Sequence, residues 1–280
     1  MNASTLKHRH IMIVAGETSG DIHAAGLIRE IKRRSPDVSV SGLGGQYLAE
    51  EGVDLYADLT KLAVIGFVEV IKHFREIRRV FYLILQKALE IRPDAVILVD
   101  YPGFNLRLAK VLKKHGIKVI YYVSPQVWAW KEQRVDLIRR VTDRMIVFFE
   151  FEQAFYARYG VDVDFVGHPL IDHVRVTSSR HDLLCNQGIP DNVPVIGIIP
   201  GSRIKEVETL LPPMIQAARL IAQAHPEARF LLTKAKDLDP MLINKHIRGT
   251  ELPIAVIDNE FHNCINACDI CMAASGTATL

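Results

Sequence analysis

Short apolar runs alternate with amphipathic helical segments through the first 170 residues, and this alternation constrains the fold more than any other feature. The runs are almost continuously apolar, so strands formed from them need a covering layer on both faces. Such strands with helices between them are typical of a parallel α/β sheet. The predicted strands are Ile11–Ala15, Val38–Leu43, Ala95–Val99, Val119–Val123, Arg144–Phe148 and Val163–Val166, and the predicted helices are Ser19–Arg34, Gly66–Glu90, Phe104–His115 and Phe151–Tyr159.

The same pattern begins again after residue 170. The second set of predicted strands is Val195–Ile199, Arg229–Thr233, Ile254–Ile257 and Ile270–Ala273, with a helix through Leu210–Ala224. We therefore predict two Rossmann-like α/β domains, residues 1–170 and 171–280, whose ligand-binding rims face a cleft. The second set ends in a helix start at Gly276–Leu280, so we expect this domain to be truncated at its C-terminal end.

Composition excludes several classes of protein. The chain of 280 residues is 49% hydrophobic and 24% charged, a balance typical of a globular protein. Its net charge of +2 is too small to indicate a nucleic-acid partner. No apolar run is as long as a membrane-spanning helix, and the run at Ile11–Ala15 is too short for a signal peptide. We therefore expect a cytoplasmic protein that contacts a membrane only at its surface.

Two patterns resemble metal sites, and we expect neither to hold a metal. Cys264, Cys268 and Cys271 have the C-x3-C-x2-C spacing of radical enzymes with an iron–sulfur cluster, which carry it on a loop. Here the cysteines fall in a predicted helix and the strand after it, which favours buried reduced thiols. Asp162 and Asp164 form the D-x-D pattern of metal-dependent sugar transferases, but we expect both carboxylates to face solvent at a strand edge. No cofactor is predicted.

The first predicted strand runs into a glycine turn, Gly16–His23. Gly16 and Gly20 allow a ligand to approach the backbone closely, and Thr18, Ser19 or Asp21 is expected to cap the following helix. Free N–H groups at such a helix start attract anions and polar groups. The turn lacks the lysine of a phosphate-binding G-x-x-x-x-G-K loop and the G-x-G-x-x-G spacing, so it marks a site without naming its chemistry.

Ligands of parallel sheets bind beyond the carboxyl ends of the strands. That rule predicts one rim for Gly16–Asp21, Gly44–Gly45, Asp100–Asn105 and Ser124–Trp130. Asp100 follows the most apolar strand and either accepts a proton from a sugar hydroxyl or caps the helix that begins near it. The two tryptophans of the chain, in Ser124–Trp130, either pack in the core or offer a platform for a sugar ring.

The second half has two helix starts rich in hydroxyl groups. In the first, Gly201, Ser202 and Arg203 precede Glu206, so backbone N–H groups and a guanidinium converge where an anion can bind. The simpler interpretation of Arg203 is a surface arginine. The second start is at Ser275–Thr277, and two such turns in one domain suit a diphosphate.

Residues 62–89 combine apolar and basic side chains. Some of the apolar residues must face the sheet, and the others suit a helix that lies on an anionic bilayer. A long core helix with a solvated basic face is the alternative. The candidate membrane contacts are Val64, Ile65, Phe67, Val68, Ile71, Phe74, Arg75 and Arg78.

Several of these motifs together resemble the lipid-A-disaccharide synthases. The matching segments are Val14–Asp21 (VAGETSGD), Tyr122–Trp130 (YVSPQVWAW), Phe165–Pro169 (FVGHP), Pro200–Arg203 (PGSR) and Ala274–Leu280 (ASGTATL), in the order in which the family has them. The resemblance implies an inverting glycosyltransferase of the two-domain GT-B type without a metal. Such an enzyme moves 2,3-diacylglucosamine from UDP to the 6-hydroxyl of 2,3-diacylglucosamine 1-phosphate, on the cytoplasmic face of the inner membrane of a Gram-negative bacterium.

The resemblance also implies roles for the candidate residues. The acceptor lies against the first domain and the UDP against the second. The acceptor-binding candidates are Gly16, Ser19, Gly20, His23, Asn105, Ser124, Trp128 and Trp130, and the UDP-binding candidates are Gly201, Ser202, Arg203, Glu206, Ser275, Gly276 and Thr277. Asp100, Asp21 and Glu17 are the candidate bases. Gly103 stands where some members carry a second acid, so no catalytic role is transferred to that position.

Two rival functions remain open at this point. The first is another UDP-sugar enzyme, either an epimerase or a transferase with a soluble acceptor, which would not need the apolar and basic stretch. The second is a sugar-nucleotide-binding protein without catalysis. Members of the family continue beyond Leu280 with a glutamate that holds the ribose, so we expect the 280-residue chain alone not to turn over.

Overall fold

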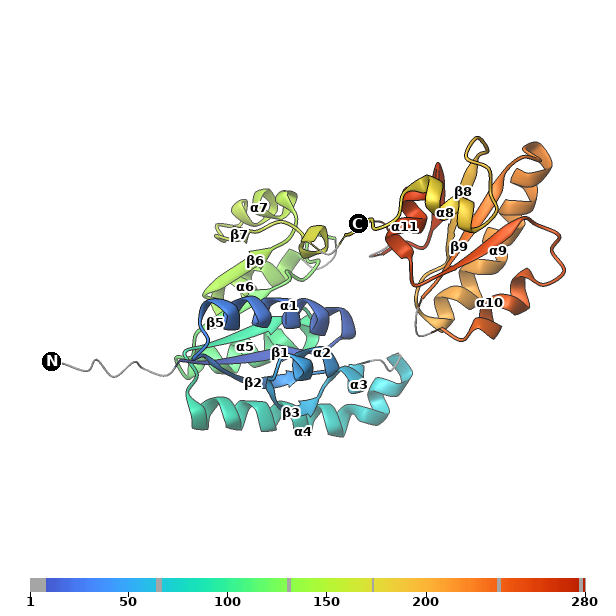
Figure 1. Cartoon of the computed structure of the whole chain (residues 1–280). Helices are drawn as coiled ribbons and strands as arrows, with labels where there is room; N and C mark the ends of the chain where they lie inside the picture. Colours follow the sequence, from blue (N-terminus) through green and yellow to red (C-terminus); the bar gives the residue numbers. More distant parts are fainter. Residues whose placement is uncertain are drawn as a thin grey trace. The chain divides into compact units, whose positions relative to one another are not determined.

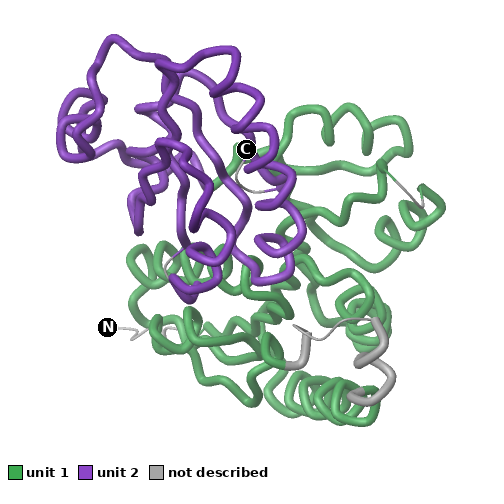
Figure 2. Tube along the Cα trace, turned by 90° about the vertical axis from the view of Figure 1, so that its right-hand side faces the viewer, with its two compact units in different colours: residues 1–169 green, residues 170–280 purple. Residues whose placement is uncertain are grey.

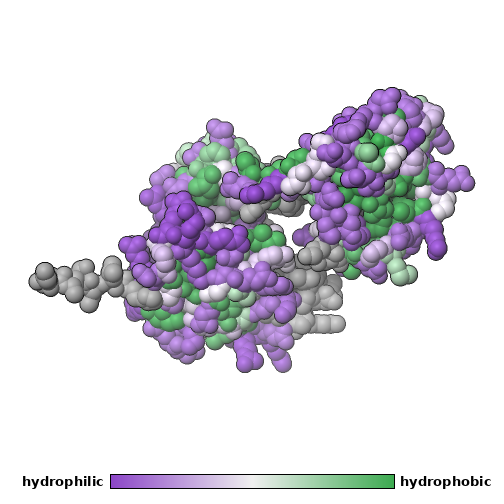
Figure 3. Space-filling view, viewed as in Figure 1, coloured by the Kyte–Doolittle hydropathy of each residue, from purple (hydrophilic) through white to green (hydrophobic). Residues whose placement is uncertain are grey.

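The computed structural model describes residues 9–63, 67–129, 132–172, 174–235, 238–276 and 279. The chain divides into two compact units, residues 1–169 and 170–280 (Figure 2). Each unit is an open parallel α/β sheet with helices on both of its faces, as the sequence predicts. Hydrophilic residues cover much of the surface seen in Figure 3, with hydrophobic residues between them.

Unit 1 contains a seven-stranded sheet in the order β3-β2-β1-β4-β5-β6-β7, and every neighbouring pair is parallel. The strands are β1 (His10–Ala15), β2 (Ser39–Gly44), β3 (Asp54–Asp58), β4 (Ala95–Val99), β5 (Val119–Tyr122), β6 (Arg144–Val147) and β7 (Asp164–Phe165). The strand order reverses between β1 and β4. A ligand is therefore expected beyond the carboxyl ends of these two strands.

Helices cover both faces of this sheet (Figure 1). They are α1 (Thr18–Arg34), α2 (Gln46–Glu50), α3 (Thr60–Ala63), α4 (Phe67–Ile91), α5 (Pro102–Lys114), α6 (Val135–Val141) and α7 (Glu150–Ala157), with short 3-10 turns η1 (Glu132–Arg134) and η2 (Pro169–Asp172). Ile28 of α1 packs on one face of the sheet, with Ile13 and Ile97. Ile84 of α4 and Leu108 of α5 pack on the other. Alternate residues of each strand thus enter two separate cores.

Unit 2 repeats this plan with four parallel strands in the order β10-β9-β8-β11. Its elements are α8 (Arg180–Asn186), β8 (Val195–Ile199), α9 (Ile204–Ala224), β9 (Arg229–Lys234), α10 (Pro240–Ile247), β10 (Ile254–Asp258), α11 (Phe261–Ala267) and β11 (Ile270–Ala273). Residues of α9 and α10 pack on one face, and residues of α8 and α11 on the other. The order reverses between β8 and β11, so the turns after Ile199 and Ala273 flank the expected binding position.

The main departures from the predicted elements are short or polar ones. β3 was not predicted because its sequence, DLYAD, begins and ends with aspartate. The helix α5 begins at Pro102 and not at Phe104, since proline suits the first turn of a helix. Within the described residues, no helix is both long and apolar enough to cross a bilayer.

Candidate functional sites

Three strained residues lie at the ends of β4 and β5 in unit 1. Asp100 and Tyr101 follow β4 with φ angles of 44° and 43°, and Val123 follows β5 with φ of 69°. Positive φ is uncommon outside glycine and is a clear outlier for a β-branched valine. Such strain persists only where surrounding contacts enforce it, and it gathers at functional sites.

Buried hydrogen bonds hold the backbone of Asp100 in this conformation. The Tyr121 hydroxyl donates to the Asp100 carbonyl at 2.6 Å, and the Asn105 amide donates to the same oxygen at 2.8 Å. The Asp100 N–H donates to the carbonyl of Tyr122 on the neighbouring strand. Asn105 is completely buried. This corrects the expectation that Asn105 contacts the acceptor, because its side chain fixes the backbone of Asp100 inside the unit.

The side chain of Asp100 lines a pocket of about 600 Å³ with Pro102, Val123–Val127 and Arg134. Burial, and after it the negative charge of Glu17, raises the pKa of the carboxyl to about 6. Tyr101 is the N-cap residue of α5, and no side chain caps this helix. The alternative interpretation, in which Asp100 caps the helix, is therefore wrong. A carboxylate with this pKa is ionised at neutral pH and more basic than an ordinary aspartate.

The glycine turn after β1 makes one packing contact, through Gly16, and one set of buried hydrogen bonds, through Asp21. A Cβ at Gly16 would lie 2.3 Å from the Tyr101 ring, so only glycine lets that ring pack here. Asp21 is 1% exposed, and its two oxygens accept N–H groups of Gly45 at 2.7 Å and Tyr47 at 2.9 Å. The residue before α1 is Glu17, which makes no side-chain cap, so the predicted capping by Thr18, Ser19 or Asp21 is wrong.

A row of aromatic rings extends from the same edge of unit 1. Trp128 meets Phe151 edge-on with 5.0 Å between ring centroids, and Phe151 stacks on Phe149. His168 lies 5.4 Å from Phe149 and 5.9 Å from His23. Trp128 is 36% exposed, which fits a surface platform better than a core position. Trp130 lies outside the described residues.

A buried carboxylate supports the loop that carries Trp128. Glu152 is 3% exposed and accepts the N–H of Phe149 at 3.1 Å. Burial raises the pKa of Glu152, against bonds from Phe149, Ser124 and Trp128 that lower it. Ser124 is itself buried and bonded to the Tyr156 hydroxyl at 2.9 Å. Ser124 therefore anchors the loop.

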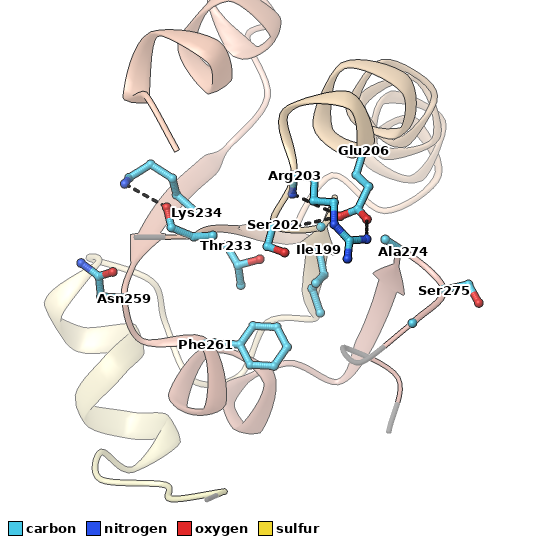
Figure 4. A pocket seen from close by; sticks show the side chains of 13 residues that line it. Ile199, Ser202, Arg203, Glu206, Thr233, Lys234, Asn259, Phe261, Ala274 and Ser275 are labelled. Atoms are coloured by element: carbon cyan, nitrogen blue, oxygen red, sulfur yellow. Dashed lines mark hydrogen bonds and ion pairs between the residues drawn. The ribbon is translucent and has the colours of Figure 1, made fainter. Parts of the chain in front are cut away.

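Unit 2 holds a second pocket of about 420 Å³ at its own strand reversal (Figure 4). Among its lining residues are Gly201, Ser202, Arg203, Glu206, Ser275 and Gly276. Described residues of both predicted turns thus line the same pocket, while Thr277 lies outside the described residues. Ser275 points away from the other labelled side chains in Figure 4.

The start of α9 already holds a carboxylate. One oxygen of Glu206 accepts the N–H groups of Ser202 at 3.1 Å and Arg203 at 3.2 Å, and the other pairs with the Arg203 guanidinium at 2.7 Å. Burial works to raise the pKa of Glu206, but the bonds from Arg203 and Ser202 lower it. The backbone N–H groups and the guanidinium thus converge on one anion, the Glu206 carboxylate of the chain itself.

The comparisons with known proteins decide the family. Residues 11–280 match the sequence profile described as lipid-A-disaccharide synthetase. The chain belongs to this family. It is 45% identical over 272 residues to the lipid-A-disaccharide synthase of Trichlorobacter lovleyi, covering 97% of this chain and 71% of that protein. It is 42% identical to lipid-A-disaccharide synthase 1 of Legionella pneumophila, covering 96% and 71%.

Solved structures of other proteins share the fold of this chain. A UDP-GlcNAc 2-epimerase from Neisseria meningitidis, bound to UDP-GlcNAc, aligns with a TM-score of 0.63 at 13% identity, over 95% of this chain and 78% of that one. MurG of Acinetobacter baumannii aligns with a TM-score of 0.53 at 15% identity, over 97% and 73%. The chain thus has a GT-B fold, which glycosyltransferases and epimerases share.

Two residues that line the pockets were not predicted from the sequence. Lys234, at the end of β9, is 8% exposed and pairs with Asp258 at 3.1 Å beside the unit 2 pocket. Its signal was a lysine two residues after the apolar run Phe230–Leu232, at the end of a predicted buried strand, where a buried charge needs a partner. Arg134 lines the unit 1 pocket. One indication of this position was present in the sequence: Arg134 lies shortly after the tryptophan-containing segment Ser124–Trp130.

The metal-like patterns have ordinary surroundings. Asp162 and Asp164 are exposed, as predicted, and Asp164 lies 3.5 Å from Arg144. Cys264 is buried, Cys268 and Cys271 are half-buried, and all are free thiols. No group of three or more potential metal ligands occurs in the part of the chain that the structure describes.

The described part of α4 is amphipathic. Val80, Ile84 and Ala88 are buried against the sheet, while Phe74 and Tyr82 are each 55% exposed. Arg75 and Arg78 are exposed, and the Arg78 guanidinium lies 5.6 Å from the centre of the Tyr82 ring. The other predicted membrane contacts, Val64, Ile65 and the side chains of Phe67, Val68 and Ile71, fall outside the described residues.

Proposed function

We propose that this protein transfers 2,3-diacylglucosamine from UDP to the 6-hydroxyl of 2,3-diacylglucosamine 1-phosphate, with inversion at the anomeric carbon. The products are UDP and the disaccharide 1-phosphate of lipid A. Membership of the family supports the reaction. The observation that carries the mechanism is Asp100, a carboxylate with a pKa of about 6 in a pocket at the strand reversal of unit 1.

Asp100 is the general base in this proposal. It accepts the proton of the 6-hydroxyl while that oxygen forms a bond to C1 of the donor sugar. The bond from C1 to the β-phosphate oxygen breaks, and its electron pair leaves with UDP. Asp21 is less suited because backbone N–H groups occupy both of its oxygens. Glu17 acts through its charge, which makes Asp100 more basic.

The unit 2 pocket is proposed to hold UDP. Arg203 and Lys234 are the cations among its described lining residues, and developing charge on the leaving phosphate is stabilised by such groups. Phe261 also lines the pocket and offers a ring face to a flat base (Figure 4). Unit 1 is then the acceptor domain, and unit 2 the donor domain.

We place the protein on the cytoplasmic face of the inner membrane as a peripheral protein. Both substrates carry acyl chains, so an enzyme that rests on the bilayer meets them where they reside. The exposed Phe74 and Tyr82, with Arg75 and Arg78 between them, support contact with an anionic surface.

The experiment is a transfer assay with the protein that carries this chain. UDP-2,3-diacylglucosamine and UDP-N-acetylglucosamine are each supplied with the acylated acceptor phosphate, and products are identified by mass spectrometry. We expect disaccharide 1-phosphate and UDP from the acylated donor alone, and loss of product in D100N. Epimerised UDP-N-acetylglucosamine, or binding of the donor without any product, would favour the rival functions.

A further inference from the structure

Arg134 is a cation that lines the unit 1 pocket, and it has no counterion among the residues that the structure describes. It ends the 3-10 turn η1, is half-buried, and lines the same pocket as Asp100. Neither an ion pair nor a hydrogen bond joins its guanidinium to any residue that the structure describes. The two nearest acids in the sequence bond elsewhere: Glu132 accepts a bond from the Tyr159 hydroxyl at 2.7 Å, and Asp136 lies 3.4 Å from the Arg139 guanidinium.

Two arginines that are more exposed than Arg134 do have acidic partners. Arg139 pairs with Asp136 in the next turn of α6, and Arg203 pairs with Glu206 in the other pocket. A half-buried guanidinium is costly to leave without an acceptor for its five N–H groups. Arg134 is therefore poised for an anion that comes from outside the chain.

The rest of the pocket lining limits where that anion can bind. Among the described lining residues, Arg134 is the cation, Asp100 is the anion, and the polar groups between them are Ser124 and Gln126. Asp100 and Arg134 share the pocket without forming an ion pair. A ligand that satisfies both needs a hydroxyl at one end and an anionic group at the other.

We propose that Arg134 binds the phosphate of the acceptor sugar while Asp100 receives the proton of its 6-hydroxyl. This inference rests on the proposed function and names the residue that recognises the phosphorylated acceptor. A guanidinium presents two parallel N–H groups to two phosphate oxygens, which a neutral acceptor cannot match. Arg134 thus selects the acceptor and sets its direction in the pocket.

The test compares R134Q with the matched variant R140Q. Arg140 lies on α6, the helix that directly follows Arg134; it is exposed and donates to the backbone carbonyl of Asp136. Each protein is assayed with 2,3-diacylglucosamine 1-phosphate and with the same sugar carrying a methyl group in place of the phosphate. We expect R134Q to raise the acceptor KM about 10- to 100-fold for the phosphorylated acceptor, the size of a hydrogen bond to a charged group. The methyl acceptor's KM should stay unchanged, and R140Q should resemble wild type.

Three results would overturn the inference. If R134Q raises the KM for both acceptors equally, Arg134 has a structural role and does not recognise the phosphate. R134Q that keeps the preference for the phosphorylated acceptor would place the phosphate elsewhere. Loss of binding to phosphatidylglycerol vesicles with the acceptor preference intact would assign Arg134 to a lipid headgroup.

Failure of the proposed function is distinguishable from failure of this inference. If wild-type protein transfers to neither acceptor, calorimetry with glucosamine 1-phosphate and glucosamine tests the pocket directly. Binding of the phosphorylated sugar that R134Q loses and R140Q keeps would support the site. Equal binding to R134Q and wild type would overturn it.

Discussion

The carboxylate of Asp21 on α1 accepts the backbone N–H of Gly45 at 2.7 Å, and so ties the first helix to the glycine turn after β2. A Cβ at Gly44 or Gly45 would lie 2.8 Å from an oxygen of that carboxylate. Asp21, Gly44 and Gly45 resemble parts of ligand-binding loops in the sequence, but here they pack together as one buried contact. These contacts hold the start of α1 against the turn between β2 and α2.

Asp21→Ala should therefore lower the free energy of unfolding by about 2–4 kcal/mol, because two backbone N–H groups lose their acceptor and a buried space opens. Urea unfolding at neutral pH measures the change. Asp37→Ala, at an exposed position, is the control and should change stability little. If D21A unfolds like the control yet abolishes transfer, Asp21 belongs to the chemistry.

Asp100→Asn should stabilise the protein at pH 7.5. Burial raises the pKa of this carboxyl to about 6, so its contribution to stability is present below pH 4 and is lost as pH rises through 6. The neutral amide of asparagine does not lose this stability as pH rises, and the difference is at most about 2–3 kcal/mol in the free energy of unfolding. Asparagine also tolerates the positive φ at this position. Thermal unfolding at pH 4 and 7.5 tests this, with a gain at the higher pH only. A gain of equal size at both pH values would contradict the assignment.

Glu17→Gln should move the acid limb of the pH profile of kcat/KM to lower pH. Glu17 raises the pKa of Asp100 through its negative charge, and the base must be ionised to act. Asp54→Asn, an exposed change on β3, should leave the profile unchanged. If the acid limb of the kcat/KM profile lies at the same pH in E17Q and in wild type, then Glu17 does not influence the pKa of the catalytic base.

Arg203 and Glu206 should be energetically coupled in UDP binding. R203Q leaves the Glu206 carboxylate without its partner beside the diphosphate, so we expect UDP affinity to fall about 10- to 100-fold. In R203Q/E206Q the Glu206 carboxylate no longer repels the diphosphate, so the loss of UDP affinity should be smaller than in R203Q alone. Calorimetry with UDP measures the cycle, and K205Q is the control on the same exposed turn. Additive losses would show that Glu206 does not face the nucleotide.

The strand pattern was predictable because buried strands of a parallel sheet need continuous apolar runs, and β4 was predicted to the residue. The strand order follows from contacts between distant segments, which periodicity does not encode. The same holds for individual side chains. Asn105 and Asp21 are polar residues on a predicted rim, and only the fold shows that they point inward to bond the backbone. Arg134 carries no motif, and its role becomes visible through the pocket it shares with Asp100.

Exposed residues of α4 should bind the protein to anionic membranes. Phe74 and Tyr82 expose apolar surface while Arg75 and Arg78 supply charge, and each arginine near such a surface contributes about 1 kcal/mol. We expect sedimentation with phosphatidylglycerol vesicles, a several-fold loss of binding in R75Q/R78Q, and a further loss in F74S/Y82S. R139Q/R140Q removes the same charge from α6 and should bind like wild type. Binding should weaken as salt rises, because screening acts on the basic residues. Equal losses in the α4 and α6 pairs would mean that net charge, and not α4, attracts the membrane.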